Sequence, residues 1–133
     1  MKGGGNMDNR LEFGKYLEEK RKNNGFTLRG LAAELEIAPA YLSDIEKGRR
    51  NPSDEKLKAI IEALRLNEEE AFRFLDLAAK AKENTVSADL PDYIMETDLA
   101  RVALRRAKEG KLSSDDWQDV IDLIDKKIKG VEE

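Results

Sequence analysis

The chain has 133 residues, of which 40% are hydrophobic, 39% charged and 6% aromatic, a composition typical of amphipathic helices. It contains no Cys and no His, which excludes disulfides, thiolate chemistry, acid–base catalysis by His and the usual zinc ligands. We therefore expect a protein that is not an enzyme and that holds no metal or cofactor. No apolar run approaches the roughly 18 residues of a membrane span, and residues 1–10 lack the apolar core of a signal peptide, so we expect a cytoplasmic protein without membrane contact.

Five helices are predicted in the first part of the chain. Residues 1–9 precede them as an expected disordered head. Helix one covers about 10–23, helix two 28–35 after a Thr27 cap, and helix three 39–47. Helix four follows Pro52-Ser53, and helix five follows an Asn67 cap, with an apolar set of Phe72, Phe74, Leu75, Ala78 and Ala81. We expect residues 10–82 to form one compact all-α domain.

A second helical segment is predicted after a linker at 83–91. Two helices within 92–130, joined through Gly110 and a Ser113/Ser114 cap, indicate an antiparallel hairpin. The last helix has the clearest apolar stripe in the chain, formed by Trp117, Val120, Ile121, Ile124 and Ile128. A hairpin alone is too small to bury five large side chains. The stripe therefore packs on the first domain, on a second copy of the chain, or on another protein.

Charge also separates the two halves of the chain. Residues 1–66 hold 13 Lys and Arg against 11 Asp and Glu, whereas residues 67–133 hold 11 against 17. A mildly basic first half and an acidic second half indicate different partners for the two halves, although solvated helix surfaces give the same pattern.

Residues 11–66 carry several motifs in one register. These are Arg21, the segment "TLRGLA" at 27–32, "YLSDIEKG" at 41–48, and the Pro52-Ser53 start of helix four. Together they resemble the helix-turn-helix family of lambdoid phage repressors and Xre-type bacterial regulators. The resemblance implies a five-helix domain that binds double-stranded DNA, with helix three in the major groove and homodimers spanning two half-sites.

The resemblance also implies a role for individual residues. The base-facing positions correspond to Pro39, Ala40, Ser43 and Asp44. Phosphate contacts fall to the region of Thr27, Arg29, Tyr41, Lys47, Arg49, Arg50 and Asn51. Arg21 and Glu46 correspond to a structural ion pair that joins helix one to helix three.

The sequence departs from the family pattern at three positions. Glu36 stands where the turn usually has Gly, which implies a steric cost if the backbone there is left-handed. Ala38 replaces the usual Ser or Thr cap of helix three. Asp44 stands where a longer polar or basic side chain often contacts a base; a carboxylate only accepts hydrogen bonds, and cytosine N4 is its best donor.

Two functions remain open from the sequence. The first is a sequence-specific transcriptional regulator, a repressor or autoregulator, that acts as a homodimer. The alternative is an antitoxin-like or phage-type regulator whose acidic C-terminal helices bind a toxin, a metallopeptidase or another protein, with DNA binding secondary.

Overall fold

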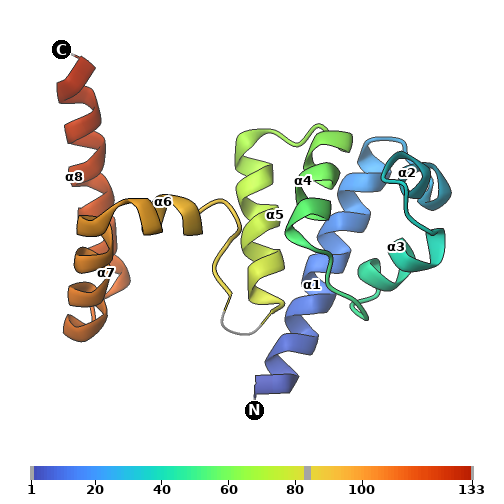
Figure 1. Ribbon diagram of the computed structural model, residues 1–133, viewed down its shortest axis with the longest axis horizontal. Helices are drawn as coiled ribbons and strands as arrows, with labels where there is room; N and C mark the ends of the chain where they lie inside the picture. Colours follow the sequence, from blue (N-terminus) through green and yellow to red (C-terminus); the bar gives the residue numbers. More distant parts are fainter. Residues whose placement is uncertain (1, 83–84, 133) are drawn as a thin grey trace. The chain divides into compact units, whose positions relative to one another are not determined.

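The computed structural model describes residues 2–82 and 85–132, and within these ranges every regular element is an α-helix (Figure 1). The helices are α1 (Lys2–Asn23), α2 (Leu28–Glu34), α3 (Pro39–Glu46), α4 (Asp54–Ala63), α5 (Glu68–Lys80), α6 (Pro91–Glu96), α7 (Asp98–Gly110) and α8 (Ser114–Glu132). The prediction of an all-α fold is confirmed. In the described part of the chain no helix has the length and apolar character needed to cross a bilayer.

The chain divides into two compact units, Met1–Pro91 and Asp92–Glu133. In the first unit, α1 packs against both α3 and α5, and α2 packs against α3 (Figure 1). Phe13 of α1 and Phe74 of α5 lie at the centre with ring centroids 5.0 Å apart. The buried core around them is formed by Leu17, Leu31, Ala32, Leu35, Leu42, Ile45, Leu57, Ile60, Leu64, Leu75, Leu77 and Ala78.

The predicted apolar set of α5 is wrong at one position. The side chain of Phe72 is 49% exposed, and Leu77, which the prediction omitted, is 2% exposed. Each residue of an α-helix turns the side chain by about 100°, so Phe72, two residues before the buried Phe74, lies on the far side of the helix. Phe72 was assigned to the core because it is hydrophobic, whereas the period of the helix places it on the exposed face of α5.

Helix α1 begins earlier than expected. The helix starts at Lys2, within the segment 1–9 for which a disordered head was expected. The Asn9 side chain donates a hydrogen bond from Nδ2 to the carbonyl oxygen of Lys80, at 2.9 Å, and so joins α1 to the end of α5.

Five helices end in the same backbone motif. At the end of α2, the N–H of Ile37 donates to the carbonyl of Ala32, and the N–H of Glu36 donates to that of Ala33. The same pair of bonds closes α1, α3, α4 and α7. This motif needs a left-handed residue, which is glycine after α1 and α3 but Glu36, Arg65 and Lys111 after the other three. The left-handed backbone considered for Glu36 is therefore present, with φ of 57°.

We expect Glu36→Gly to raise the free energy of unfolding by about 0.5–1 kcal/mol, since relief of left-handed strain outweighs the added entropy of glycine. Urea denaturation measures the change. Arg65→Gly is the matched control, because Arg65 occupies the same position after α4 with φ of 52° and should gain a similar amount. A loss of stability at Glu36 alongside a gain at Arg65 would contradict the strain argument.

A network of polar contacts fastens α1 to α5. Lys20 Nζ lies 2.9 Å from Glu70 Oε2 and 5.1 Å from the centre of the Tyr16 ring. Glu70 also accepts a hydrogen bond from the backbone N–H of Asn67, whose side chain in turn caps α5. The backbone bond from Asn67 and then the Lys20 ammonium lower the pKa of Glu70, and the bond to Glu70 raises the pKa of Lys20.

The expected linker at 83–91 is partly ordered against the first unit. Residues 83–84 lie outside the described residues. Ser87 is buried and donates a hydrogen bond from Oγ to Oδ1 of Asp76 on α5, and Ala88 packs against the core. Pro91 then begins α6.

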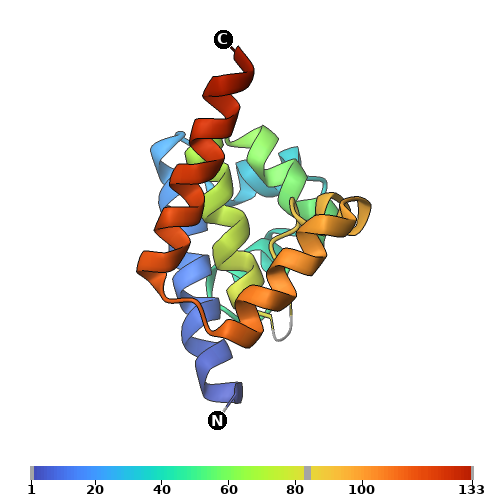
Figure 2. The same cartoon turned by 90° about the vertical axis from the view of Figure 1, so that its left-hand side faces the viewer.

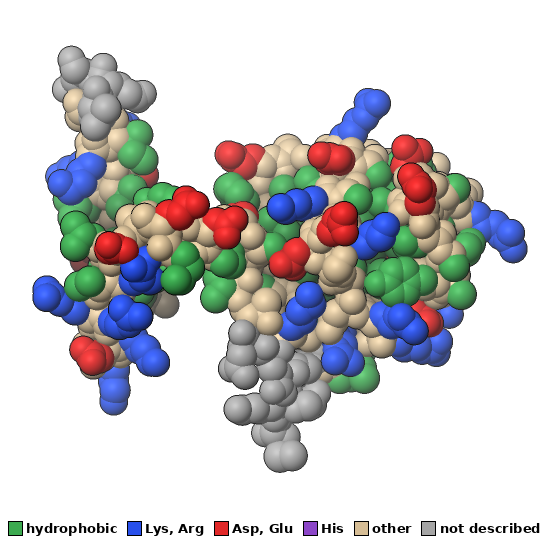
Figure 3. Space-filling view, viewed as in Figure 1, with side chains coloured by type: hydrophobic (Ala, Val, Ile, Leu, Met, Phe, Trp, Pro, Cys, Tyr) green, Lys and Arg blue, Asp and Glu red, His purple; other side chains and the backbone are tan. Residues whose placement is uncertain are grey.

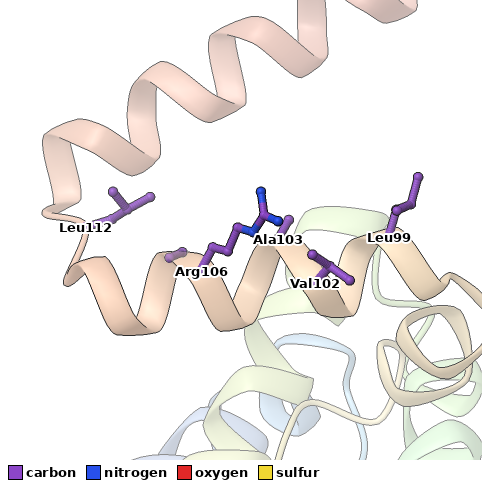
Figure 4. Close-up of a pocket in the computed structure, with 6 residues that line it drawn as sticks. Leu99, Val102, Ala103, Arg106 and Leu112 are labelled. Carbon is purple, nitrogen blue, oxygen red and sulfur yellow. The ribbon is translucent and has the colours of Figure 1, made fainter.

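The second unit departs from the predicted hairpin in two ways. The first predicted helix is two helices, α6 and α7, and Arg101 of α7 donates to the carbonyls of Ile94 and Met95 at the end of α6. In addition, α7 and α8 diverge from the turn between them instead of packing along their length (Figures 2 and 4). Ser113 caps α8 as predicted, since its Oγ accepts the N–H of Asp116 at 3.1 Å.

The apolar stripe of α8 is uncovered in the described structure. Val120 is half-buried, and the other four side chains are exposed by 38% for Trp117, 47% for Ile121, 49% for Ile124 and 56% for Ile128. Because α7 diverges from α8, the described residues of the second unit leave most of the stripe exposed.

Candidate nucleic-acid interface

Helices α2 and α3 form a pair with one buried and one open face. Thr27 caps α2, as predicted, by accepting the N–H of Gly30 on Oγ1 at 2.9 Å. At the start of α3, Ala38 provides no side-chain cap, and Pro39 occupies the first turn, where a missing N–H costs nothing. Leu31 and Ala32 of α2 and Leu42 and Ile45 of α3 are buried against the core, which leaves the opposite faces of both helices open.

The proposed base-facing residues lie on the open side of α3. Pro39 and Ala40 are exposed, and Ser43 and Asp44 are half-buried. Ala40, Ser43 and Asp44 follow one another around the helix on the side away from Leu42 and Ile45. The four side chains are small, two of them are apolar, and Asp44 is the one charged member.

The segment after α3 carries the basic side chains. Gly48 is buried, with φ of 80°, and a Cβ there would lie 3.3 Å from the backbone nitrogen of Leu11 on α1. This close approach turns the chain so that Lys47, Arg49 and Arg50, all exposed, emerge beside α3. In Figure 3, Lys and Arg side chains gather over the end of α3 and the connection to α4.

Two of these basic side chains are held by residues of α3. The guanidinium of Arg50 lies over the ring of Tyr41, 5.3 Å from its centre. Arg49 Nη1 lies 3.6 Å from Asp44 Oδ1, and the backbone N–H of Arg49 donates to the Asp44 carbonyl at 2.8 Å. Thr27 and Arg29 at the start of α2 are exposed, and Asn51 is half-buried.

Beneath this face, Arg21 and Glu46 form a buried ion pair between α1 and α3. Arg21 Nε lies 2.6 Å from Glu46 Oε2, Nη2 lies 3.1 Å from Oε1, and Nη1 donates to the Phe26 carbonyl at 3.0 Å. Both side chains are less than 10% exposed. The hydrogen bond to Glu46 raises the pKa of Arg21 above its ordinary value. Because Glu46 is the last residue of α3, the pair fixes where the basic segment begins.

Comparison with known proteins assigns this arrangement to a family. Residues 17–70, from the middle of α1 into the first turn of α5, match the family model described as Helix-turn-helix. This segment of the chain belongs to the helix-turn-helix family. Over 53 residues this chain is 43% identical to the transcriptional regulator ClgR of Mycobacterium tuberculosis. The match covers 40% of this chain and 47% of that protein. The chain thus spans about half the length of the first curated relatives that it matches.

Three further proteins are similar to this chain over longer segments. The HTH-type transcriptional regulator DdrOP3 of Deinococcus deserti is 26% identical over 114 residues, covering 78% of this chain and 88% of that protein. The crystal structure of the clp gene regulator ClgR from Corynebacterium glutamicum is 32% identical and covers 71% of this chain and 88% of that one, with a TM-score of 0.46. Cyanate hydratase of Aquifex aeolicus is 32% identical over 72 residues, covering 54% of this chain and 48% of that protein.

Sequence reasoning missed one residue that positions the helix-turn-helix pair. Gly14 is buried where α1 crosses α3, and a Cβ added there would overlap the backbone carbonyl group of Glu46, lying only 2.7 Å from its carbon. The available signal was a lone glycine in the middle of an amphipathic helix, on the same side as Leu17 and Arg21. Such a glycine indicates close backbone approach, but its partner helix is visible only in the fold.

Proposed function

We propose that the protein is a transcriptional regulator, acting as a repressor, that binds double-stranded DNA through α2 and α3 as a homodimer. The observation that carries the proposal is the open face of α3 in a helix-turn-helix domain, bordered by the exposed Lys47, Arg49 and Arg50. In this geometry α3 enters the major groove and the basic side chains contact phosphates on either side of it. With neither His nor Cys in the chain, we assign it no catalytic role.

The small side chains of α3 shape this proposal. Pro39 and Ala40 offer only apolar contact, for example with a thymine methyl, and Ser43 discriminates weakly between bases. Affinity therefore rests mainly on phosphate contacts, and such affinity falls steeply as the salt concentration rises. The salt dependence of DNA binding tests the assignment directly.

We expect the double variant Arg49→Ala, Arg50→Ala to bind all duplex sequences more weakly. The slope of log affinity against log salt should become shallower by about 0.9 to 1.8 per bound chain, since each lost phosphate contact removes about 0.9 and Arg49 also pairs with Asp44. Fluorescence anisotropy with a random-sequence duplex between low and physiological salt measures both quantities.

The matched control is Lys126→Ala, Lys127→Ala, which makes the same change of charge on exposed residues of α8. It should leave the slope close to that of the wild type. Equal slopes for both double variants would show that the basic segment after α3 does not contact phosphates.

The second unit supports the homodimer. The helix that carries the exposed stripe, α8, follows a helix of opposite charge in the chain: α7 holds four Lys and Arg against two Asp and Glu, whereas residues 114–125 of α8 hold five Asp and no Lys or Arg. An open apolar groove on α7 is lined by Leu99, Val102, Ala103, Arg106, Ala107 and Leu112 (Figure 4). In a symmetric dimer the α8 stripe of each copy would meet this groove on the other, with Asp and Arg side chains facing one another.

We expect Ile121→Asn with Ile124→Asn to convert a dimer into a monomer in multi-angle light scattering, because both side chains are about half exposed and contribute little to the unit's own core. The control pair Lys126→Asn, Lys129→Asn changes exposed polar positions on the side of the same helix away from the stripe and should stay dimeric. A monomeric wild-type protein would contradict the homodimer and leave the stripe to a different protein.

A further inference from the structure

The pairing of Asp44 with Arg49 places opposite charges at one edge of the open face of α3. The carboxylate is 36% exposed and the guanidinium 67% exposed, at 3.6 Å. The backbone bond from the Arg49 N–H to the Asp44 carbonyl, part of the motif that ends α3, holds the two residues together. The pair is thus set by the local backbone and does not depend on a distant element.

This ion pair is weak enough to be exchanged. Exposed pairs are screened by water and salt, and the Arg49 side chain is the more open of the two. A DNA phosphate beside the basic segment therefore competes with Asp44 for the guanidinium. When Arg49 turns to phosphate, the Asp44 carboxylate is left without its counter-charge, next to the groove.

An uncompensated carboxylate in the major groove favours one base by repelling the hydrogen-bond acceptors of the others. It accepts hydrogen bonds and repels the acceptors of guanine and the O4 of thymine. Adenine presents an amino group next to the N7 acceptor, whereas the cytosine amino group has only a C–H neighbour on that edge. Cytosine is therefore the base that meets Asp44 with the least repulsion.

We infer that Asp44 is a negative determinant of sequence specificity and that Arg49 shields its charge until DNA is bound. On duplexes without a suitably placed cytosine, Arg49 is divided between Asp44 and phosphate, which lowers non-specific affinity. On the correct site, Arg49 moves to phosphate and the cytosine amino group takes its place. This inference rests on the proposed DNA-binding function.

The test compares full-length wild type with Asp44→Asn, using a random-sequence duplex over a salt series. The asparagine variant should bind random DNA more tightly, with a slope of log affinity against log salt steeper by up to about 0.9 per chain, because Arg49 is then no longer shared with Asp44. Glu69→Gln removes one exposed negative charge in the first turn of α5 and should change neither quantity. Unchanged random-DNA binding by Asp44→Asn would overturn the inference, whereas no DNA binding by the wild type would instead overturn the proposed function.

Two further measurements test the exchange and the base. Arg49→Ala should weaken random-DNA binding by a smaller factor in the wild type than in Asp44→Asn, because Arg49 of the wild type is shared between Asp44 and phosphate, whereas Arg49 of Asp44→Asn contacts phosphate alone; equal factors would overturn the exchange. Sites selected from a random pool by the wild type should share a cytosine at one position in each half-site, and Asp44→Ala should lose that preference alone. Identical selected sites would overturn the role of Asp44 in specificity.

Discussion

Replacing Glu46 with alanine is expected to lower the free energy of unfolding by about 3–5 kcal/mol, the usual cost of removing one partner from a buried ion pair. The substitution leaves the Arg21 guanidinium buried with only the Phe26 carbonyl as partner. Urea denaturation followed by circular dichroism measures the loss. We expect stability to fall before any base contact changes, because Glu46 lies on the inner side of α3.

The Glu18–Lys22 pair provides the control for this experiment. It lies on the same helix as Arg21, with its charged atoms 3.0 Å apart, but its side chains are 41% and 63% exposed. Glu18→Ala should therefore cost no more than about 0.5 kcal/mol. A Glu46→Ala protein that unfolds like the wild type would show that the pair between α1 and α3 contributes nothing to stability.

Replacing Gly14 with alanine is expected to destabilise the fold by about 1–3 kcal/mol or more, the range for overpacking a close contact. Alanine is the better helix former by about 1 kcal/mol, so the clash must exceed this gain. The added methyl group meets the backbone of Glu46, which has no rotamer to relieve the overlap. Relief requires α3 to move away from α1, and thermal unfolding should report the loss.

Gly130→Ala in α8 is the matched control, because a Cβ there has no atom within 4 Å. It should leave the stability unchanged or raise it slightly. If Gly14→Ala were as stable as Gly130→Ala, the close approach of α1 and α3 would not constrain the position of the helix-turn-helix pair.

The parts of the fold that were predictable depend on local chemistry. Thr27, Ser53 and Asn67 each cap a helix in the structure by accepting a backbone N–H three residues later. A capping residue and the apolar period after it lie within a few positions of one another, so both are visible in sequence. A left-handed backbone at Glu36 was considered because the family resemblance places glycine at this turn position, and the structure has φ of 57° there.

The features that were missed depend on contacts between distant residues. The start of α1 involves Asn9 and Lys80, 71 positions apart, and the importance of Gly14 depends on a carbonyl 32 positions away. The divergence of α7 and α8 involves no local signal, since both helices have amphipathic patterns that suit a closed hairpin. In the structure both helices instead expose apolar side chains, among them Leu99 of α7 and Ile121 of α8.

The candidate interface combines both kinds of information. The family resemblance implies that Asp44 faces bases and that Arg49 contacts phosphates. It gives no reason to connect the two residues. The structure brings their charged atoms to 3.6 Å through the turn after α3. The sequence alone shows Asp44 only as a residue that limits which base can be contacted. The structure adds Arg49 as its charged partner, and this pairing can be tested.

We propose that α3 lies in the major groove of duplex DNA in each half of a dimer. Protection of guanine N7 from methylation reports occupation of that groove, and the measurement uses a duplex selected by the full-length protein. We predict two protected half-sites centred about 34–36 Å apart, one helical turn, with the protection lost in Arg49→Ala, Arg50→Ala. Binding of the selected duplex without protection of guanine N7 would show that α3 does not occupy the major groove.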